Sequence, residues 1–509
     1  MRAVRHAPGL LPLRWYDSWR ERTTPNAIVA ADLNLFHWVA RKHWPIGDRL
    51  LPGLSRAANN SFLWKAIAIA IGLAGGRFDR RAALRGMVSI ALASALTNIP
   101  GKLISRRTRP DLEVVPVVRR LARLPSSTSF PSGHAASAFA FATGAAIERP
   151  VLAPILFPLA AVVAYSRVYT GVHYPSDVVA GAALGAGFAA ATRRWWPVAS
   201  DEPAEAGANT TRLEDRPGSS GQGLVVIVNP NAGGALDSEP AELIADGLPE
   251  AEIIEPDEAE DLGEILEKAA AGSAVLGIAG GDGSVNAAAA VAHRYGEPLV
   301  IFPAGTLNHF ARDLGLEDFD DTIQAVKQGH TVAVDMAMID GQGFVNAASF
   351  GSYVDLVDAR ERLEKRIGKW PAVLFASIVL MWRGRPVSVE IDGRRERVWM
   401  VFIGNCVYEP GGLAPHWREN LDDGQLDIRL VDGSRPFARL RLAWALLTGT
   451  LGRSPVYRTY QTSGPVRVRS LQGRPLRLAR DGETFNASAE EFTIEKAAEP
   501  LIVFVPRAD

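Results

Sequence analysis

Five apolar segments follow one another between residues 61 and 192, and this clustering is the strongest constraint on the fold. They are rich in alanine and glycine and cover 61–76, 86–101, 134–147, 150–166 and 178–192. Small residues allow helices to pack closely in a bilayer, although each segment is near or below the roughly 17–25 residues that a spanning helix needs. An all-α membrane helical bundle is therefore predicted for residues 1–196, and a soluble all-helical bundle is the alternative.

Other features of the composition narrow the class of protein. Ala27–Ala40 is apolar but contains Asp32, which suggests an interfacial or packed amphipathic helix rather than a span. A net charge of -1 gives no case for nucleic-acid binding. The single cysteine, Cys406, excludes an intrachain disulfide framework. The arginine-rich N-terminus lacks the order of segments expected of a removable signal peptide.

The composition changes abruptly at Pro197. Residues 197–223 are polar, contain Pro, Gly and Ser, and are predicted to be a linker. Residues 224–335 alternate buried-strand and helix patterns, which predicts an α/β nucleotide-binding domain with a largely parallel sheet. From 336 to 509, short alternating strands separated by Asp-Gly turns predict a mostly antiparallel β domain.

Three segments in the first 196 residues contain side chains suited to a phosphoryl group. Lys102 and Arg109 lie in KLISRRTRP, residues 131–134 read PSGH, and residues 166–177 read SRVYTGVHYPSD. Cations and helix N-terminal amides stabilise phosphate charge. One histidine can attack phosphorus while the other protonates the leaving oxygen. All three segments lie at ends of apolar runs, on one predicted face of the bundle.

These patterns, in this order, resemble the type 2 phosphatidic acid phosphatase family, whose fold is shared with vanadium haloperoxidases and some bacterial acid phosphatases. The similarity covers about residues 30–195. It implies that His173 is the nucleophile, forming a phosphohistidine, that Asp177 is its partner and that His134 is the general acid. It also implies that no metal is required and that phosphate is bound by Lys102, Arg109, Ser132, Gly133 and Arg167.

The α/β part contains two glycine-rich loops after predicted strands. Residues 280–284 read GGDGS, residues 303–315 read PAGTLNHFARDLG, and NPNAGG begins at Asn229 after an earlier strand. Without side chains at the glycines, backbone amides can approach phosphate oxygens closely. Asp282 could serve Mg²⁺ or a water network.

These loops resemble the catalytic domain of diacylglycerol kinases and their bacterial lipid kinase relatives, over about 223–505. The resemblance implies ATP and Mg²⁺ as cofactors, Asp481 of the DGE tripeptide as the base and Asp423 as a structural Mg²⁺ ligand. Ser284 stands where Thr is usual, and His309 stands where Asp is common. The implied nucleotide-binding residues are Asn229, Gly280, Gly281, Asp282, Gly283, Ser284, Gly305, Thr306, Asn308 and Glu483.

Together the two halves predict a bifunctional multi-pass membrane enzyme with lipid substrates. One half would dephosphorylate a lipid or polyprenyl phosphate, and the other would phosphorylate a diacylglycerol-like hydroxyl. Because ATP is cytosolic, the kinase half is predicted to be cytoplasmic, which agrees with the basic loop 77–85 on the same side. The phosphatase site is then predicted to lie on the opposite, extracytoplasmic face. A homo-oligomer is compatible with the sequence. Arginines 106, 107, 119, 120 and 123 would then face outward, some of them toward phosphate or anionic headgroups.

Two alternatives remain open at this stage. One half could be a non-catalytic module that binds only lipid or nucleotide. The first half could instead be a vanadate-dependent peroxidase, although the apolar runs and the fused kinase-like part argue against it.

Overall fold

The computed structural model divides into two compact units, Met1–Val198 and Ala199–Asp509. It describes residues 26–97, 107–121, 127–198, 203–208, 218–230, 239–257, 260–352, 354, 368, 379, 384–409 and 417–507. Each unit is considered by itself below.

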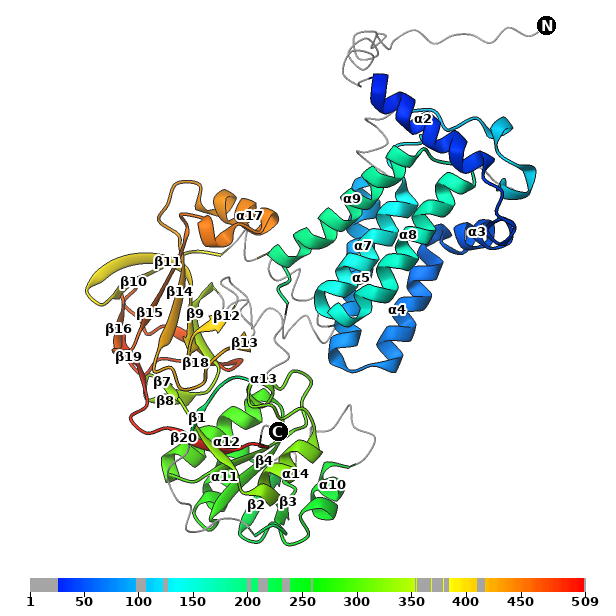
Figure 1. Ribbon diagram of the computed structural model, residues 1–509. Helices are drawn as coiled ribbons and strands as arrows, with labels where there is room; N and C mark the ends of the chain where they lie inside the picture. Colours follow the sequence, from blue (N-terminus) through cyan, green and yellow to red (C-terminus); the bar gives the residue numbers. More distant parts are fainter. Residues whose placement is uncertain are drawn as a thin grey trace, which may run out of the picture. The chain divides into compact units, whose positions relative to one another are not determined.

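The first unit is helical, and α7 lies at its centre (Figure 1). Helix α7 packs against α5, α8 and α9, and α4 packs against α5. The described parts of all five predicted apolar segments are helical, as expected. The described helices are α2 (Asn26–Arg41), α3 (Pro45–Ala57), α4 (Phe62–Ala74), α5 (Arg77–Leu96), α7 (Gly133–Glu148), α8 (Ala153–Tyr169) and α9 (Pro175–Ala191), with short 3₁₀ turns between some of them.

Glycines explain how closely α9 approaches α7. A Cβ atom on Gly181 would collide with the carbonyl oxygen of Ser132, and one on Gly185 would collide with that of Ala136. Only glycine fits at such contacts, because any side chain would push the helices apart. The glycine-rich composition of 178–192 therefore sets the α7–α9 contact, which in turn places the first residues of both helices side by side.

Few of these helices meet the requirements for a membrane span. Among the described helices, Pro150–Tyr169 is long and apolar enough by itself. The pair Pro45–Ala57 and Asn59–Ala74 meets the requirements together, with a 66° bend between its members. Length and composition thus identify one or two candidate spans, fewer than the five apolar segments suggested.

The second unit begins with a three-layer α/β part. Its seven-stranded sheet has the order β1-β6-β20-β5-β4-β2-β3. Strands β3, β2, β4, β5 and β20 are parallel, and β6 and β1 are antiparallel to their neighbours. The strands are β1 (Gly207–Ala208), β2 (Leu224–Val228), β3 (Glu252–Ile254), β4 (Val275–Gly280), β5 (Leu299–Pro303), β6 (Thr331–Val334) and β20 (Leu501–Phe504).

Helices cover both faces of this sheet (Figure 1). On one face α11, α12 and α13 share a buried core with the sheet. On the other face α10 and α14 do so. The strands are consequently apolar throughout, as parallel strands buried on both faces must be. The helices are α10 (Pro240–Gly247), α11 (Leu262–Ala270), α12 (Asp282–Tyr295), α13 (His309–Asp313) and α14 (Phe319–Gln328).

The remainder is an eleven-stranded antiparallel sheet, and its described residues include the helix α17 (Ala438–Thr448). The predicted Asp-Gly turns lie between strands, for example between β10 and β11 and between β17 and β18. The strands are β7 (Ala337–Ile339), β8 (Gln342–Phe344), β9 (Ala347–Gly351), β10 (Val387–Ile391), β11 (Arg394–Asn405), β14 (Leu426–Asp432), β15 (Tyr457–Thr462), β16 (Val466–Ser470), β17 (Arg477–Arg480), β18 (Glu483–Asn486) and β19 (Glu491–Lys496). A separate pair joins β12 (Tyr408–Glu409) to β13 (Trp417–Arg418).

Two short segments differ from the predicted boundaries. Residues 203–208, expected within the linker, include β1, which pairs with the edge strand β6. Residues 501–504, expected in the β domain, form β20 between β5 and β6 of the α/β sheet. An edge strand gains partners for its unpaired N–H and C=O groups by such additions. The β-rich part is therefore an insertion between two strands of the α/β sheet.

Candidate active sites

A pocket of about 210 Å³ lies in the helical unit where α7 begins and α8 ends. Five predicted site residues line it: Arg109, Gly133, His134, Arg167 and His173. They come from all three motif segments, so the predicted convergence on one face is what the structure shows. Lys102 lies outside the described residues.

The position of His173 suits a nucleophile. Its ring is 4% exposed, with Nε2 3.4 Å from Arg109 Nη1 and Nδ1 3.7 Å from Asp177 Oδ2. A guanidinium only donates hydrogen bonds, so Nε2 presents its lone pair and Nδ1 holds the proton toward Asp177. Burial lowers the pKa of His173, with Arg167 and Arg109 adding to the effect. The imidazole is therefore neutral near pH 7, as a nucleophile must be.

Asp177 is fully buried and is held by several donors. Its Oδ1 accepts a hydrogen bond from Arg107 Nη1 at 2.7 Å. Its Oδ2 accepts from the Tyr174 N–H at 2.9 Å and from the Ser129 hydroxyl. These partners keep the carboxylate ionised and oriented toward the imidazole, which suits a group that stabilises a charged histidine.

Arg107 extends this network to a residue whose role the motifs did not indicate. Its guanidinium also pairs with Asp32 of α2, and Asp32 accepts from the Ser176 N–H at 2.8 Å. Asp32 is 6% exposed. A carboxylate inside an otherwise apolar helix was the available signal, since such a group needs a buried partner. Asp32 therefore anchors α2 beside the site.

The PSGH residues have different tasks. His134 Nε2 lies 2.8 Å from Asn59 Oδ1, an acceptor, so Nε2 carries a proton as a general acid requires. Gly133 begins α7, whose N-terminal amides can receive an anion. The Ser132 hydroxyl accepts from the Ala135 N–H at 3.5 Å, and the Ser132 N–H donates to the Asp177 carbonyl at 2.9 Å. Ser132 thus connects the helix start to α9 and is not among the pocket-lining residues described.

Some arginines of the helical unit line the pocket, and others are paired with protein groups away from it. Arg109 donates to the Val172 and Ser127 carbonyls at 2.6 and 3.1 Å, which aims it at the pocket. Arg167 is 1% exposed and contacts the Ser55 hydroxyl. Arg119, expected among the outward arginines, is buried instead and donates to Asp48 and to the Ala40 and Lys42 carbonyls. Arg107 and Arg119 therefore have protein partners in place of headgroups.

The second unit places its predicted phosphate loops together at one sheet edge. Strands β2, β4 and β5 are parallel neighbours, so Asn229, the 280–284 loop and the 303–308 loop follow their carboxyl ends. Asn229 Nδ2 donates to Ser284 Oγ at 2.6 Å. Ligands bind at such edges in open parallel sheets. Residues 231–234 of NPNAGG lie outside the described residues.

The two glycine loops approach each other closely. A Cβ on Gly305 would lie 2.5 Å from Gly281 Cα and 2.6 Å from Asn308 Oδ1. Asn308 accepts from the Gly305 N–H and donates to the Gly305 carbonyl, both at 2.9 Å. Asn308 thus fixes the shape of its loop, while Thr306 is exposed at its tip. The half-buried Asp282 accepts from the His309 N–H at 2.6 Å, linking the two loops.

The DGE turn reaches this edge from the β-rich part. Glu483 Oε1 would lie 3.5 Å from a Cβ on Gly283. Asp481 lies half-buried two residues earlier and accepts from the N–H groups of Val345, Asn346 and Ala347 at 3.0, 3.1 and 2.8 Å. Burial raises the pKa of Asp481 to about 6 against the opposing effect of these donors. A carboxylate with such a pKa suits a general base.

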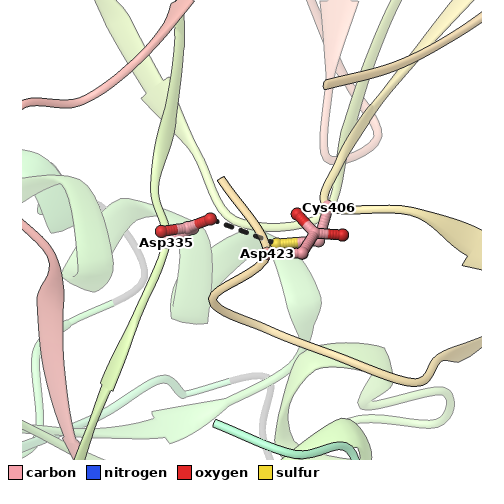
Figure 2. Close-up of side chains that lie close together, drawn as sticks. All are labelled: Asp335, Cys406 and Asp423. Atoms are coloured by element: carbon pink, nitrogen blue, oxygen red, sulfur yellow. Dashed lines mark hydrogen bonds between the residues drawn. The ribbon is translucent and has the colours of Figure 1, made fainter. Parts of the chain in front are cut away.

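Asp423 belongs to a different cluster, shown in Figure 2 with Asp335 and Cys406. Lys496 Nζ lies 2.8 Å from Asp335 Oδ2 and 3.4 Å from Cys406 Sγ. Burial raises the pKa of the Cys406 thiol to about 12. Two carboxylates, a protonated thiol and an ammonium do not match Mg²⁺, which prefers oxygen ligands. Asp423 as a magnesium ligand stays a prediction.

Arg418 is a buried residue that the motifs did not reveal. Its guanidinium pairs with Asp313 of α13 and donates to the Val345 carbonyl at 2.7 Å. It therefore connects the second glycine loop to the backbone that holds Asp481. The partner Asp313 lies within PAGTLNHFARDLG, but nothing local to Arg418 in the sequence marks the contact.

Comparison with known proteins identifies a family for each of the two parts. The family model of the PAP2 superfamily matches residues 82–201, and that of the diacylglycerol kinase catalytic domain matches residues 223–339. The chain combines a phosphatase-type domain with a lipid kinase-type domain. It belongs to the PAP2 superfamily through the first and to the diacylglycerol kinase catalytic domain family through the second.

Named relatives exist for each part. A decaprenylphosphoryl-5-phosphoribose phosphatase of Mycobacterium tuberculosis is 36% identical over 136 residues, covering 26% of this chain and 72% of that protein. A "Probable lipid kinase YegS-like" protein of Pseudomonas aeruginosa is 30% identical over 268 residues, covering 49% and 86% respectively. A diacylglycerol kinase of Bacillus subtilis is 31% identical over 182 residues, covering 34% of this chain and 59% of that protein. The chain thus spans little more than half the length of that kinase.

Proposed function

We propose that this chain is a bifunctional membrane enzyme that removes phosphate from a lipid or polyprenyl phosphate and phosphorylates a lipid hydroxyl with ATP. The observation that supports the proposal is that each unit brings several of its predicted site residues together. His173, His134, Arg109 and Arg167 share one pocket. The glycine loops, Asp282 and Glu483 meet at one sheet edge.

In the phosphatase reaction, His173 Nε2 attacks phosphorus and forms a P–N bond while the bond to the leaving oxygen breaks. His134 donates the Nε2 proton to that oxygen. Asp177 stabilises the positive charge that develops on the His173 ring. Arg109, Arg167 and the Gly133 amide hold the transferring oxygens, with Lys102 as a further predicted cation. Water then cleaves the P–N bond, with His134 accepting its proton.

In the kinase reaction, Asp481 accepts the proton of the lipid hydroxyl, whose oxygen attacks the γ-phosphorus of ATP and releases ADP. The amides of the Gly280–Ser284 and Gly305–Asn308 loops would hold the phosphates. Asp282 would hold Mg²⁺, since its half-buried carboxylate is oriented by the N–H of His309 from the neighbouring loop. The cation supplies charge neutralisation on the transferring phosphates.

A membrane location is supported by the outward surface of the helical unit. Large apolar side chains are exposed on four helices, α4, α5, α8 and α9: Ile69, Leu73, Leu84, Leu92, Ile155, Val179 and Leu184. Exposed apolar surface of this kind marks contact with lipid or protein. A cytoplasmic kinase unit and an extracytoplasmic phosphatase pocket are part of the proposal, because ATP is cytosolic.

The test incubates the full-length protein in lipid nanodiscs with labelled ATP and total membrane lipids, and identifies the labelled lipid. Phosphate release from lipid phosphates is measured in parallel. His173→Ala should abolish phosphate release and spare lipid labelling, whereas Asp481→Asn should do the reverse. Intact phosphate release by His173→Ala would contradict the phosphohistidine mechanism. Nucleotide binding without transfer to any lipid would leave the second half as a binding module.

A further inference from the structure

Helix α17 of the β-rich part exposes a continuous apolar face. Leu440, Trp444 and Leu447 are 69%, 65% and 71% exposed, and Phe437 at the helix start is 78% exposed. Their spacing of three and four residues places them on one side of the helix. Most large apolar side chains in a folded protein are buried more deeply, so four on one short helix call for a partner.

The opposite side of α17 already has its partner. Ala438, Leu442 and Ala445 are buried against Val431, Leu451 and Tyr457 of the same unit. The helix is thus fixed to the protein by one face and presents the other outward (Figure 1 shows α17 lying along the β-rich part). With 11 residues it is about 16 Å long, too short to cross a bilayer.

The charges around the exposed face indicate what covers it. Arg441 is exposed beside the apolar stripe, and Arg439 lies on the other side of the stripe, where it donates to the Gly384 carbonyl at 2.7 Å. Residues 433–453 contain Arg435, Arg439, Arg441 and Arg453 and no Asp or Glu, and Arg435 pairs with Asp432 immediately before them. An apolar stripe flanked by arginines, with a tryptophan in it, matches the interface of a membrane that contains anionic lipid.

We propose that α17 docks the kinase unit on an anionic lipid surface, with Leu440, Trp444 and Leu447 in the acyl boundary and Arg441 among the headgroups. This would hold the kinase unit at the membrane in which its substrate lies. The inference rests on the proposed function only in taking that substrate to be a membrane lipid.

The experiment uses the full-length protein in vesicles of phosphatidylcholine with a minority of phosphatidylglycerol. The one natural cysteine, Cys406, is buried, so a fluorophore can be attached selectively to a Leu447→Cys variant. The matched control is Lys268→Cys, on the exposed side of α11. Quenching by a lipid-attached nitroxide and by aqueous iodide is measured for both probes.

We expect the probe at 447 to be quenched several-fold more strongly by the lipid nitroxide than the probe at 268. Equal quenching at the two positions overturns the proposal. So does a probe at 447 that is shielded from iodide but not reached by the lipid nitroxide, because protein would then cover the face. Arg441→Gln should reduce the quenching of the 447 probe by the lipid nitroxide. Unchanged quenching would show that Arg441 makes no contact with the headgroups.

A kinetic readout separates docking from catalysis. Leu447→Glu should lower phosphorylation of lipid in these vesicles about tenfold while leaving the rate on the same lipid in detergent micelles unchanged. Equal losses in both would overturn docking. A wild-type protein that phosphorylates no lipid in either form contradicts the proposed kinase function, while the quenching measurement still decides whether α17 meets the membrane.

Discussion

The two units would bind the same chemical group, a phosphoryl, with different kinds of donor. In the helical unit the donors are side chains, and the groups around His173 are buried and paired with one another. In the second unit the donors are backbone amides of loops whose glycines leave room for a ligand. The first site therefore depends on balanced buried charge, whereas the second depends on the absence of side chains.

Burial acts on the key titratable group of each site in a way that follows from this difference. It lowers the pKa of His173 and raises that of Asp481 to about 6, because the neutral form is favoured in both cases. His173 is thereby ready to attack. Asp481 must lose its proton before it acts as a base, so its activity requires a pH above about 6.

The largest expected effect is at Asp481. Asp481→Asn should lower the kinase rate about 10³-fold because the base is lost, with phosphate release as the internal control. In the wild type the kinase rate should rise with pH through about 6 and then level off. An acid limb that falls near pH 4, the ordinary range of an aspartate, would show that Asp481 is not the titrating base.

The next largest effect is expected at Arg107, the cation shared by two buried carboxylates of the helical unit. Arg107→Met leaves Asp32 and Asp177 without their shared cation, which should lower the free energy of unfolding by about 3 kcal/mol and abolish most phosphate release. Denaturant unfolding and phosphatase assays measure the two effects. Arg56→Met removes an exposed arginine of the same unit and should change neither. If Arg107→Met behaved like this control, the network would contribute nothing to the site.

A glycine substitution tests how far the second site depends on the close approach of its two loops. Gly305→Ala should lower the free energy of unfolding by about 1–3 kcal/mol, because its Cβ would meet Gly281 Cα at 2.5 Å. Gly281→Ala is the matched variant, since its Cβ would lie 3.5 Å from Gly305 Cα, an ordinary contact. Thermal unfolding should separate the two variants. Equal stabilities would mean that the loops adjust freely.

The smallest effect concerns the Asp335–Cys406–Asp423 cluster. Since Lys496 supplies a positive charge there, EDTA should leave the unfolding temperature of the protein unchanged. Lys496→Met should lower the free energy of unfolding by about 1 kcal/mol, and added Mg²⁺ should then raise the unfolding temperature. A fall in the unfolding temperature of the wild type with EDTA would instead support Asp423 as a metal ligand.

Local sequence patterns predicted the helices of the first unit and the strands β2, β4 and β5, because burial imposes a period or an apolar run on each of them. They also predicted which segments meet at the pocket, since the segments of His173, His134 and Arg109 lie at the ends of apolar runs. Contacts between distant residues could not be read in this way. The apolar surroundings of Asp32 indicate that it needs a partner, but they do not identify Arg107, and the sequence around Arg418 does not indicate Asp313.

The assignment of residues 501–504 shows a further limit. The apolar pattern of Leu501–Phe504 suits a strand in either sheet, and only the three-dimensional pairing with β5 and β6 decides between them. The predicted membrane bundle is limited by the same ambiguity of apolar sequence. Apolar composition alone does not distinguish a helix that faces lipid from one that is packed inside a protein.

The place of β20 has a consequence for how the protein is made. Ribosomes release the helical unit first, so it can fold while the rest is being translated. The nucleotide-binding sheet, by contrast, keeps a gap between β5 and β6 until residues 501–504 emerge. The helical unit should therefore mature earlier than the nucleotide-binding sheet in every newly made copy, and ribosome-stalled chains lacking β20 should show the proposed phosphatase activity without the proposed kinase activity.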